Sequence, residues 1–142
     1  MVGLQSQDTR ARLQWSLVAL RLGVFIVMLV WTLDKFVNPQ HASQVFAAFY
    51  GLPGLGTAAL YALAVAELGL VLAFVAGWRK RWSYGLVLVL HGVSTLSSWP
   101  QYLAPWDNLL FFAAWPMLAA CLALYLLRDH DRLAAVDTLR GR

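Results

Sequence analysis

Two ionisable side chains lie inside apolar stretches of the sequence, where charge is costly. Glu67 stands near the middle of an apolar run of roughly 20 residues, and His91 stands near the middle of the next run. The basic turn 79–81 separates the two runs, so the helices that they form would be adjacent and antiparallel. Counted from that turn, the two side chains differ in depth by only ~3 Å. We therefore expect Glu67 and His91 to meet near the middle of a membrane, directly or through one water or ligand.

The chemistry that such a pair would perform is proton transfer. An unpaired carboxylate at that depth is unstable, so the chain must pair it, keep it protonated or use it. A buried carboxyl group beside an imidazole is suited to supplying protons near neutral pH. We take Glu67 and His91 as candidate catalytic residues.

Further polar side chains are candidates for ligand binding. One face of the segment that carries His91 presents hydroxyl groups in register, which is typical either of a polar path or of hydrogen bonds between helices. A second group marks the outer ends of the first and last apolar segments, where Lys35 has Asp107 or Asp34 as partner, or forms only an exposed interfacial pair. The candidate ligand-binding residues are Trp31, Lys35, Tyr84, Ser94, Thr95, Ser98, Asp107 and Asn108.

The composition places the chain among membrane proteins. Hydrophobic residues make up 61% of its 142 residues and charged residues only 13%. Four segments are long enough to cross a membrane, and each must be a helix because lipid offers no partner for backbone amides and carbonyls. The expected fold is an all-α membrane protein, a bundle of four transmembrane helices at 16–33, 57–78, 82–99 and 109–127.

The elements between these helices are predicted from local signals. Apolar residues at helical spacing in 41–50, followed by Gly51 and Pro53, predict a short interfacial helix in the first outer loop. The small residues Ala62, Ala66, Gly69, Ala73 and Gly77 share one side of the second helix and predict its packing seam, with Glu67 facing elsewhere. We expect Arg21 to extend toward the lipid headgroups.

The basic residues set the expected orientation. All of them except Lys35 fall near the N-terminus, in the turn 79–81 or in the tail. By the positive-inside rule, both termini are cytoplasmic and the protein is a multi-pass protein of a bacterial-type inner membrane. The net charge of +4 is then a topology signal and not one for nucleic acid. The expected organisation is an N-terminal cytoplasmic segment 1–15, a membrane domain 16–128 and a cytoplasmic tail 129–142.

The sequence carries no evident ligand set for haem, flavin, an iron–sulfur cluster or another metal. It has one cysteine, Cys121, which we interpret as a small core residue, and three histidines on different sides of the membrane. Electrons would have to come from a partner or from the substrate. Besides the lipid bilayer, we therefore expect another redox or membrane subunit as partner, and leave self-association open.

The order of several short motifs resembles that of the DoxX-like family of small four-helix membrane proteins. The likeness covers about residues 17–128. The matching motifs are Arg21-Leu22-Gly23, Lys35-Phe36, FAAFYGLP at 46–53, Ala66-Glu67-Leu68-Gly69 with Gly77, and Asp107-Asn108-Leu109. Many members have His-Gly where this chain has Trp31-Thr32, so a role of that histidine does not carry over. His91 belongs to none of the family's motifs.

The resemblance implies a four-helix bundle and a link to quinone-coupled oxidation, because the family includes the membrane subunit of a thiosulfate:quinone oxidoreductase. Other members are tied to redox-stress complexes, and more distant relatives act in the assembly of membrane proteins. Three hypotheses follow. The first is a membrane subunit of a quinone-linked oxidoreductase, with a quinone as the candidate cofactor, because reduction of a quinone requires protons that Glu67 and His91 could supply. The others are a non-catalytic assembly or scaffold protein and a carrier of small solutes. Fold alone does not choose among them.

Overall fold

The computed structural model describes residues 2–140, and every regular element within that range is a helix. The α-helices are α1 (Val2–Val37), α2 (Pro39–Tyr50), α3 (Thr57–Val75), α4 (Lys80–Ser97), α5 (Trp99–Tyr102), α6 (Ala114–Leu126) and α7 (Val136–Arg140), with the 3₁₀ helices η1 (Pro105–Asp107) and η2 (Leu109–Ala113) before α6. Three stretches are long and apolar enough to cross a membrane: Gln7–Val37, Thr57–Val75 and Leu109–Leu126. The all-helical class and the apolar character of these helices are as predicted.

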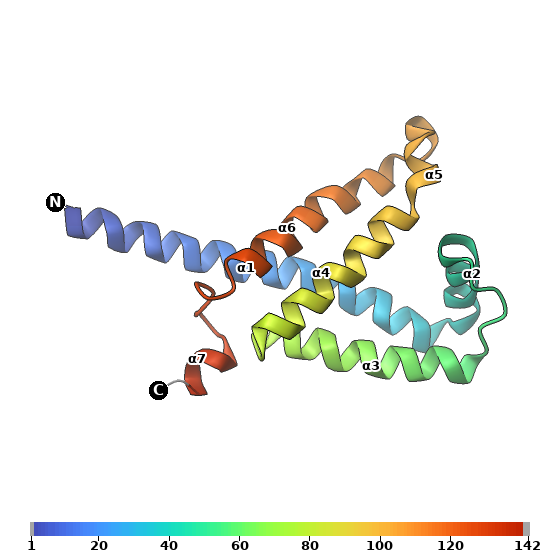
Figure 1. The fold of residues 1–142 in the computed structure, drawn as a ribbon, viewed down its shortest axis with the longest axis horizontal. Coiled ribbons are helices and arrows are strands. Elements are labelled where there is room, and N and C mark those ends of the chain that lie inside the picture. Colours follow the sequence, from blue (N-terminus) through green and yellow to red (C-terminus); the bar gives the residue numbers. More distant parts are fainter. Residues whose placement is uncertain (1, 141–142) are drawn as a thin grey trace.

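Four long helices form the body of the molecule. α1 packs against α3 and α6, and α4 packs against the same two helices, so the four enclose a common core. α2 contacts α1, α3 and α4 at one end (Figure 1). We call the opposite end, formed by residues 76–82 and 127–139, the basic end.

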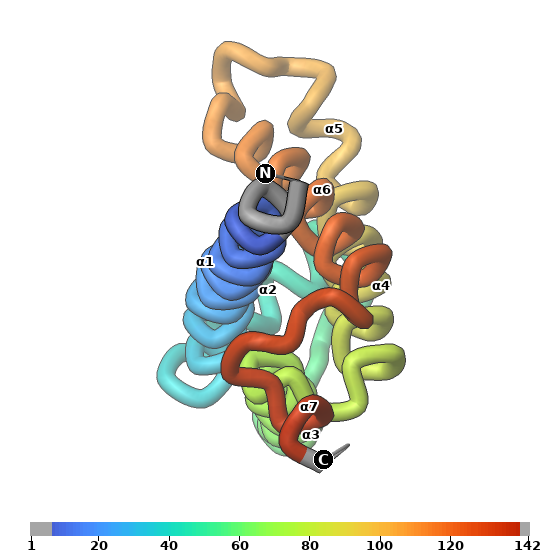
Figure 2. The backbone as a smooth tube through the Cα atoms, turned by 90° about the vertical axis from the view of Figure 1, so that its left-hand side faces the viewer, coloured from blue at the N-terminus to red at the C-terminus, as the bar shows by residue number. Residues whose placement is uncertain are grey.

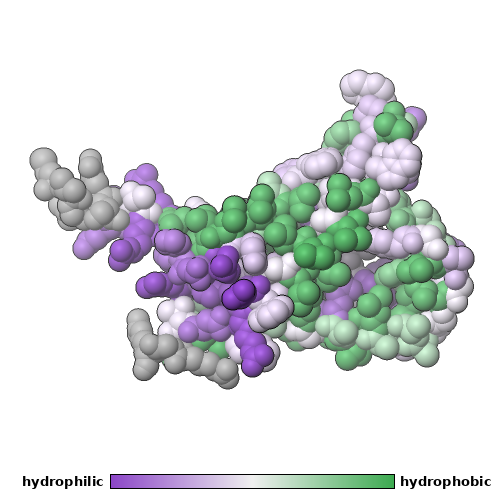
Figure 3. Space-filling model, viewed as in Figure 1, coloured by the Kyte–Doolittle hydropathy of each residue, from purple (hydrophilic) through white to green (hydrophobic). Residues whose placement is uncertain are grey.

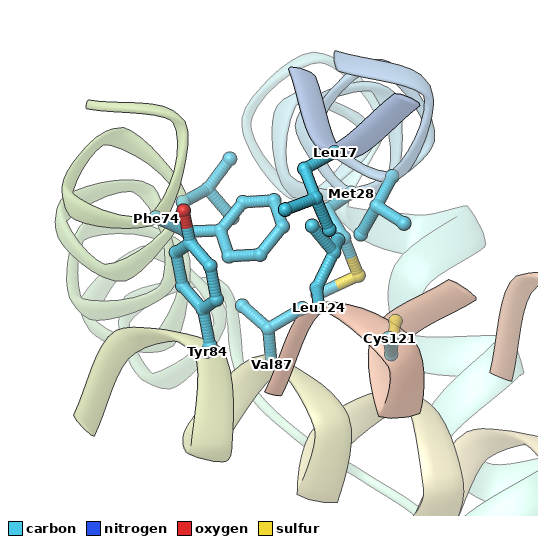
Figure 4. Packing of buried hydrophobic residues seen from close by; sticks show 9 residues of the cluster. Leu17, Met28, Phe74, Tyr84, Val87, Cys121 and Leu124 are labelled. Atoms are coloured by element: carbon cyan, nitrogen blue, oxygen red, sulfur yellow. The ribbon is translucent and has the colours of Figure 1, made fainter. Parts of the chain in front are cut away.

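The core lies where the four helices meet. Phe74 of α3 and Tyr84 of α4 are packed ring against ring, with centroids 4.9 Å apart. Cys121 and Leu124 of α6 close the core from the other side (Figure 4). Cys121 is buried and is not in a disulfide, in line with its interpretation as a small core residue. The other buried members are Leu17, Val24, Met28, Val71 and Val87.

The packed face of α3 differs from the predicted seam. Leu60, Ala64, Val71 and Phe74 are buried at helical spacing, and Glu67 lies on the same face. The small residues Ala62, Ala66 and Gly69 are exposed, and a Cβ atom added at Gly69 would meet nothing within 4 Å. The predicted seam is therefore wrong at Ala62, Ala66 and Gly69, whereas its last member, Gly77, is buried. α3 packs through large side chains, which make more dispersion contacts than a stripe of small residues does.

The N-terminal segment is also more regular than expected. α1 begins at Val2 and continues without a break into the apolar stretch, and it projects beyond the bundle at its start (Figure 1). Arg, Leu, Gln and Ala are strong helix formers and no proline interrupts them, so the helix includes residues 2–15. It runs without a break through residue 16, where the membrane domain is predicted to begin, and Met1 lies outside the described residues.

The turn signals in the first loop are confirmed. α1 ends at Val37, and α2 begins at Pro39 with the Asn38 side chain accepting a hydrogen bond from the His41 amide. Gly51 ends α2 in the left-handed region at φ 66°. The helix starts two residues before the predicted 41, because proline suits a first helical turn.

The last apolar segment consists of a 3₁₀ helix followed by an α-helix. Residues 109–113 form η2, and α6 starts only at Ala114. Pro116 has no amide hydrogen, so the preceding turn cannot form the usual α-helical hydrogen bond to Phe112 and tightens into 3₁₀ geometry.

Candidate functional site

Glu67 forms an ion pair with Lys35. The Lys35 Nζ atom lies 2.8 Å from a Glu67 carboxylate oxygen, and the two side chains are only 10% and 13% exposed. Lys35 Nζ also donates a hydrogen bond to the Trp31 carbonyl oxygen at 3.0 Å. The pair joins the last turns of α1 to the middle of α3, and it neutralises both charges inside the bundle.

This pairing corrects two expectations. Glu67 makes no direct hydrogen bond to His91, because its face of α3 packs on α1, whereas His91 lies toward α6. A link between the two through a water or a ligand stays a prediction. Lys35 pairs with neither Asp34 nor Asp107. Asp34 instead contacts the His41 ring at 2.7 Å, and Asp107 is exposed in η1. The flexible lysine stem explains the result, since it can run along apolar surface for most of a helical turn.

His91 connects α4 to α6. Its Nε2 atom lies 3.0 Å from the Ala114 carbonyl oxygen, and since a carbonyl only accepts, the ring donates this hydrogen bond. Thr95 lies 3.3 Å from the same nitrogen and donates its hydroxyl to the His91 carbonyl at 2.8 Å. Of the two interpretations that the sequence left open, this geometry is that of hydrogen bonding between helices.

Two further hydroxyl groups that continue this face, those of Ser98 and Tyr102, also bond to backbone. Ser98 donates to the Ser94 carbonyl at 3.2 Å, and Tyr102 donates to the Thr95 carbonyl at 3.0 Å. Asn108 donates its side-chain amide to the Ala104 carbonyl. These groups therefore satisfy one another along the chain and do not converge on one cavity.

Trp31 and Lys35 do lie beside each other. With Asp34, Ala42 and Phe46, they line a hollow of about 20 Å³ between α1 and α2. A hollow of this size has room for about one water molecule. Of the residues predicted from sequence, the structure thus brings Glu67, Lys35 and Trp31 into one neighbourhood at the α2 end of the bundle.

A second polar cluster, at the basic end, was missed by the sequence analysis. Arg21 is 2% exposed, so it does not extend to the headgroups as expected. Its Nη1 atom lies 3.5 Å from an Asp131 carboxylate oxygen, and its Nη2 atom donates to the Leu133 carbonyl at 2.7 Å. The Tyr84 hydroxyl donates to the same Asp131 oxygen at 2.6 Å. Tyr84 therefore belongs to this cluster and not to the polar face with His91.

The cluster exists because the chain after α6 returns to the bundle. Figure 2 shows this segment passing from the end of α6 to the end of α3. The Gln14 side chain accepts hydrogen bonds from the amides of Arg132 and Leu133, both at 2.9 Å. Asp137 accepts from the amides of Arg79 and Lys80 at 2.9 and 3.0 Å, which caps the start of α4.

Within the predicted cytoplasmic tail 129–142, Asp131 and Ala135 are therefore buried, and 141–142 lie outside the described residues. Gly77 permits the contact. Its φ is +60°, and a Cβ atom there would lie 2.7 Å from both Ala135 Cβ and Arg21 Nη1. Only glycine fits this position. A basic residue one turn inside an apolar segment was the signal that an acidic partner should be sought, and the carboxylates of 129–131 were the candidates.

Comparison with known proteins gives no assignment: no family model matches the chain, and neither a curated protein nor a solved structure matches it significantly. Among the residues that the structure describes, no group of three or more His, Cys, Asp or Glu side chains could hold a metal ion. The two polar clusters, Lys35–Glu67 at the α2 end and Arg21–Tyr84–Asp131 at the basic end, are therefore the features of the molecule that bear on function.

Proposed function

We propose that the protein is a four-helix integral membrane protein of the DoxX-like type, with α2 lying at the outer membrane surface. α4 supports this proposal even though it is more polar than the other three helices. Its outward side chains are apolar and exposed, as Val89 at 59%, Val93 at 52% and Leu96 at 64% show. Apolar surface of this extent needs lipid or a partner to cover it.

The proposed orientation puts the basic end in the cytoplasm of a bacterial-type cell. Single cysteines at Asp129 and Gln44, in a Cys121→Ala background, test this orientation in intact cells. An impermeant thiol reagent should label the cysteine at 44 from outside, and the cysteine at 129 only after the membrane is opened. Labelling of position 129 in intact cells would reverse the orientation.

Within that membrane, the protein acts as a non-catalytic subunit that anchors or assembles a redox or membrane partner. One observation carries this proposal: each candidate catalytic group has an internal partner. Glu67 is paired with Lys35, and His91 is bonded to the Ala114 carbonyl. Polar side chains that are paired within the bundle stabilise helix packing and are not free to bind a substrate.

A second candidate is direct handling of a quinone at the Lys35–Glu67 pair. The presence of an ionisable pair in an apolar bundle favours this second candidate, since charged groups are energetically unfavourable in lipid and are commonly functional there. The size of the site argues against quinone binding, because the hollow beside the pair, about 20 Å³, is too small for a quinone ring.

Quinone titration separates the two candidates. Purified protein is titrated with a short-chain quinone while tryptophan fluorescence is followed, because Trp31 lines the hollow. The matched variant is Lys35→Met/Glu67→Leu, which removes both charges and keeps the bulk. An assembly subunit should show the same weak, unsaturable quenching in both proteins. Saturable quenching of the natural protein that is lost in the variant establishes the quinone candidate instead.

A further inference from the structure

An open groove of about 1130 Å³ lies at the basic end of the molecule. Its walls come from the turn before α4, from the end of α6 with the segment that follows, and from Gln14 of α1. Hydrophilic side chains gather over this part of the surface in Figure 3. Five cations line the groove: Arg79, Lys80, Arg81, Arg128 and Arg132.

The positive charge of the groove is not neutralised from within. In the described part of the chain, none of the five cations lies within 4 Å of a carboxylate. The lining carboxylates are Asp129 and Asp137, and Asp137 is directed at the backbone amides that begin α4. The five cations therefore exceed the two lining carboxylates, and the groove carries a net positive charge.

Two of the five lining cations, Lys80 and Arg128, are held in place by contacts within the protein. Lys80 Nζ donates to the Asp131 carbonyl at 2.7 Å, and burial lowers the pKa of Lys80 although Asp131 and Asp137 oppose that effect. A further negative charge nearby would stabilise its ammonium group. Arg128 stacks over the Tyr125 ring at 4.7 Å, so its guanidinium is held in place at the groove.

The location of the groove selects the kind of anion. Trp82, which lines it, is 66% exposed, and Trp15 at the same end is 67% exposed. Exposed tryptophans of membrane proteins lie at the level of the lipid headgroups. Basic pockets at the cytoplasmic ends of membrane helices are suited to lipid phosphates. In the proposed orientation, this groove opens into the cytoplasmic headgroup layer.

We infer that the groove binds the phosphate of an anionic phospholipid, with Arg81 and Arg132 contributing from two separate chain segments. Both side chains are exposed, so their removal should not disturb folding. The inference rests on the proposed membrane placement, but lipid binding to the purified protein is measured independently of the orientation in cells. A reversed orientation and an empty groove are thus distinguishable results.

The test is a lipid titration of the delipidated protein in a neutral detergent. Phosphatidylglycerol and phosphatidylcholine with the same acyl chains are compared, and binding is counted by native mass spectrometry. Saturable binding is expected for phosphatidylglycerol only. In Arg81→Gln/Arg132→Gln its affinity should fall tenfold or more. The matched control is Arg10→Gln/Arg12→Gln, which removes the same charge from the exposed start of α1, outside the groove, and should bind as the natural protein does.

Three outcomes would overturn the inference. Equal loss in the two double variants means that general surface charge, and not the groove, attracts the lipid. Equal binding of the two lipids means that the headgroup charge is not recognised. If inorganic phosphate alone saturates the site at the concentration at which phosphatidylglycerol does, the ligand is a soluble anion and not a lipid.

Discussion

Lys35→Met removes the ammonium group from the ion pair and leaves the Glu67 carboxylate inside the bundle. At a separation of 2.8 Å and an effective dielectric constant of about 20, the direct attraction is about 6 kcal/mol. Part of it offsets the loss of water from the two charges. Breaking a buried pair from one side therefore costs about 3–5 kcal/mol. Glu67→Leu should cost a similar amount, because Lys35 keeps only its bond to the Trp31 carbonyl.

The double variant Lys35→Met/Glu67→Leu should recover most of that loss. It leaves no unpaired charge, and apolar replacement of a buried pair is often neutral or stabilising. At about 2–4 °C per kcal/mol for a chain of this size, each single variant should lower Tm by ~6–20 °C, while the double variant should stay within a few degrees of the natural protein.

The protein carries its own reporter for this measurement. Cys121 is buried and is its one cysteine, so a dye that fluoresces on reaction with thiols records unfolding in detergent. Asp107→Asn is the control, because this carboxylate is exposed and its loss should change stability by no more than about 0.5 kcal/mol. If both single variants unfold within 2 °C of the natural protein, or if the double variant loses the sum of the two, the pair does not stabilise the bundle as described.

Gly77→Ala should lower stability by about 1–3 kcal/mol, because the left-handed backbone and the contact with Ala135 both exclude a methyl group. Gly69→Ala is its counterpart on open helix surface and should be neutral or raise Tm slightly; an equal loss in both would show that the close contact is not formed. Asp131→Asn should leave Arg21 without a carboxylate and expose the segment 128–136 to limited proteolysis, and unchanged cleavage would count against the buried cluster.

Hydropathy and turn chemistry predicted the elements of the fold because they are local. The apolar runs located the long helices, and Gly51 located the end of α2, although its start was predicted two residues late. The pairing of Glu67 was not predictable in the same way. Depth along a helix follows from counting residues, but rotation about its axis depends on which face is packed, and α3 packs through large residues instead of small ones.

The basic end was missed for a different reason. Charge counting treated Arg21 as an orientation signal, which is correct for most basic residues near a membrane surface. Its carbonyl partners, Leu133 and Ala134, lie more than 110 positions later in the chain. No periodicity connects residues so far apart. The other determinant, Gly77, has a positive φ that becomes visible only in the folded chain.

The Arg21 contacts have a consequence for biosynthesis. Arg21 precedes the segment after α6 in the chain, so it is made before the carbonyls of Leu133 and Ala134 that hold its guanidinium. In the proposed membrane placement, Arg21 must stay hydrated or bound to headgroups until these carbonyls are made, so α1 reaches its final depth only after the segment that follows α6. A chain whose synthesis stops after α6 would then have its long helices, with the first one displaced toward the membrane surface.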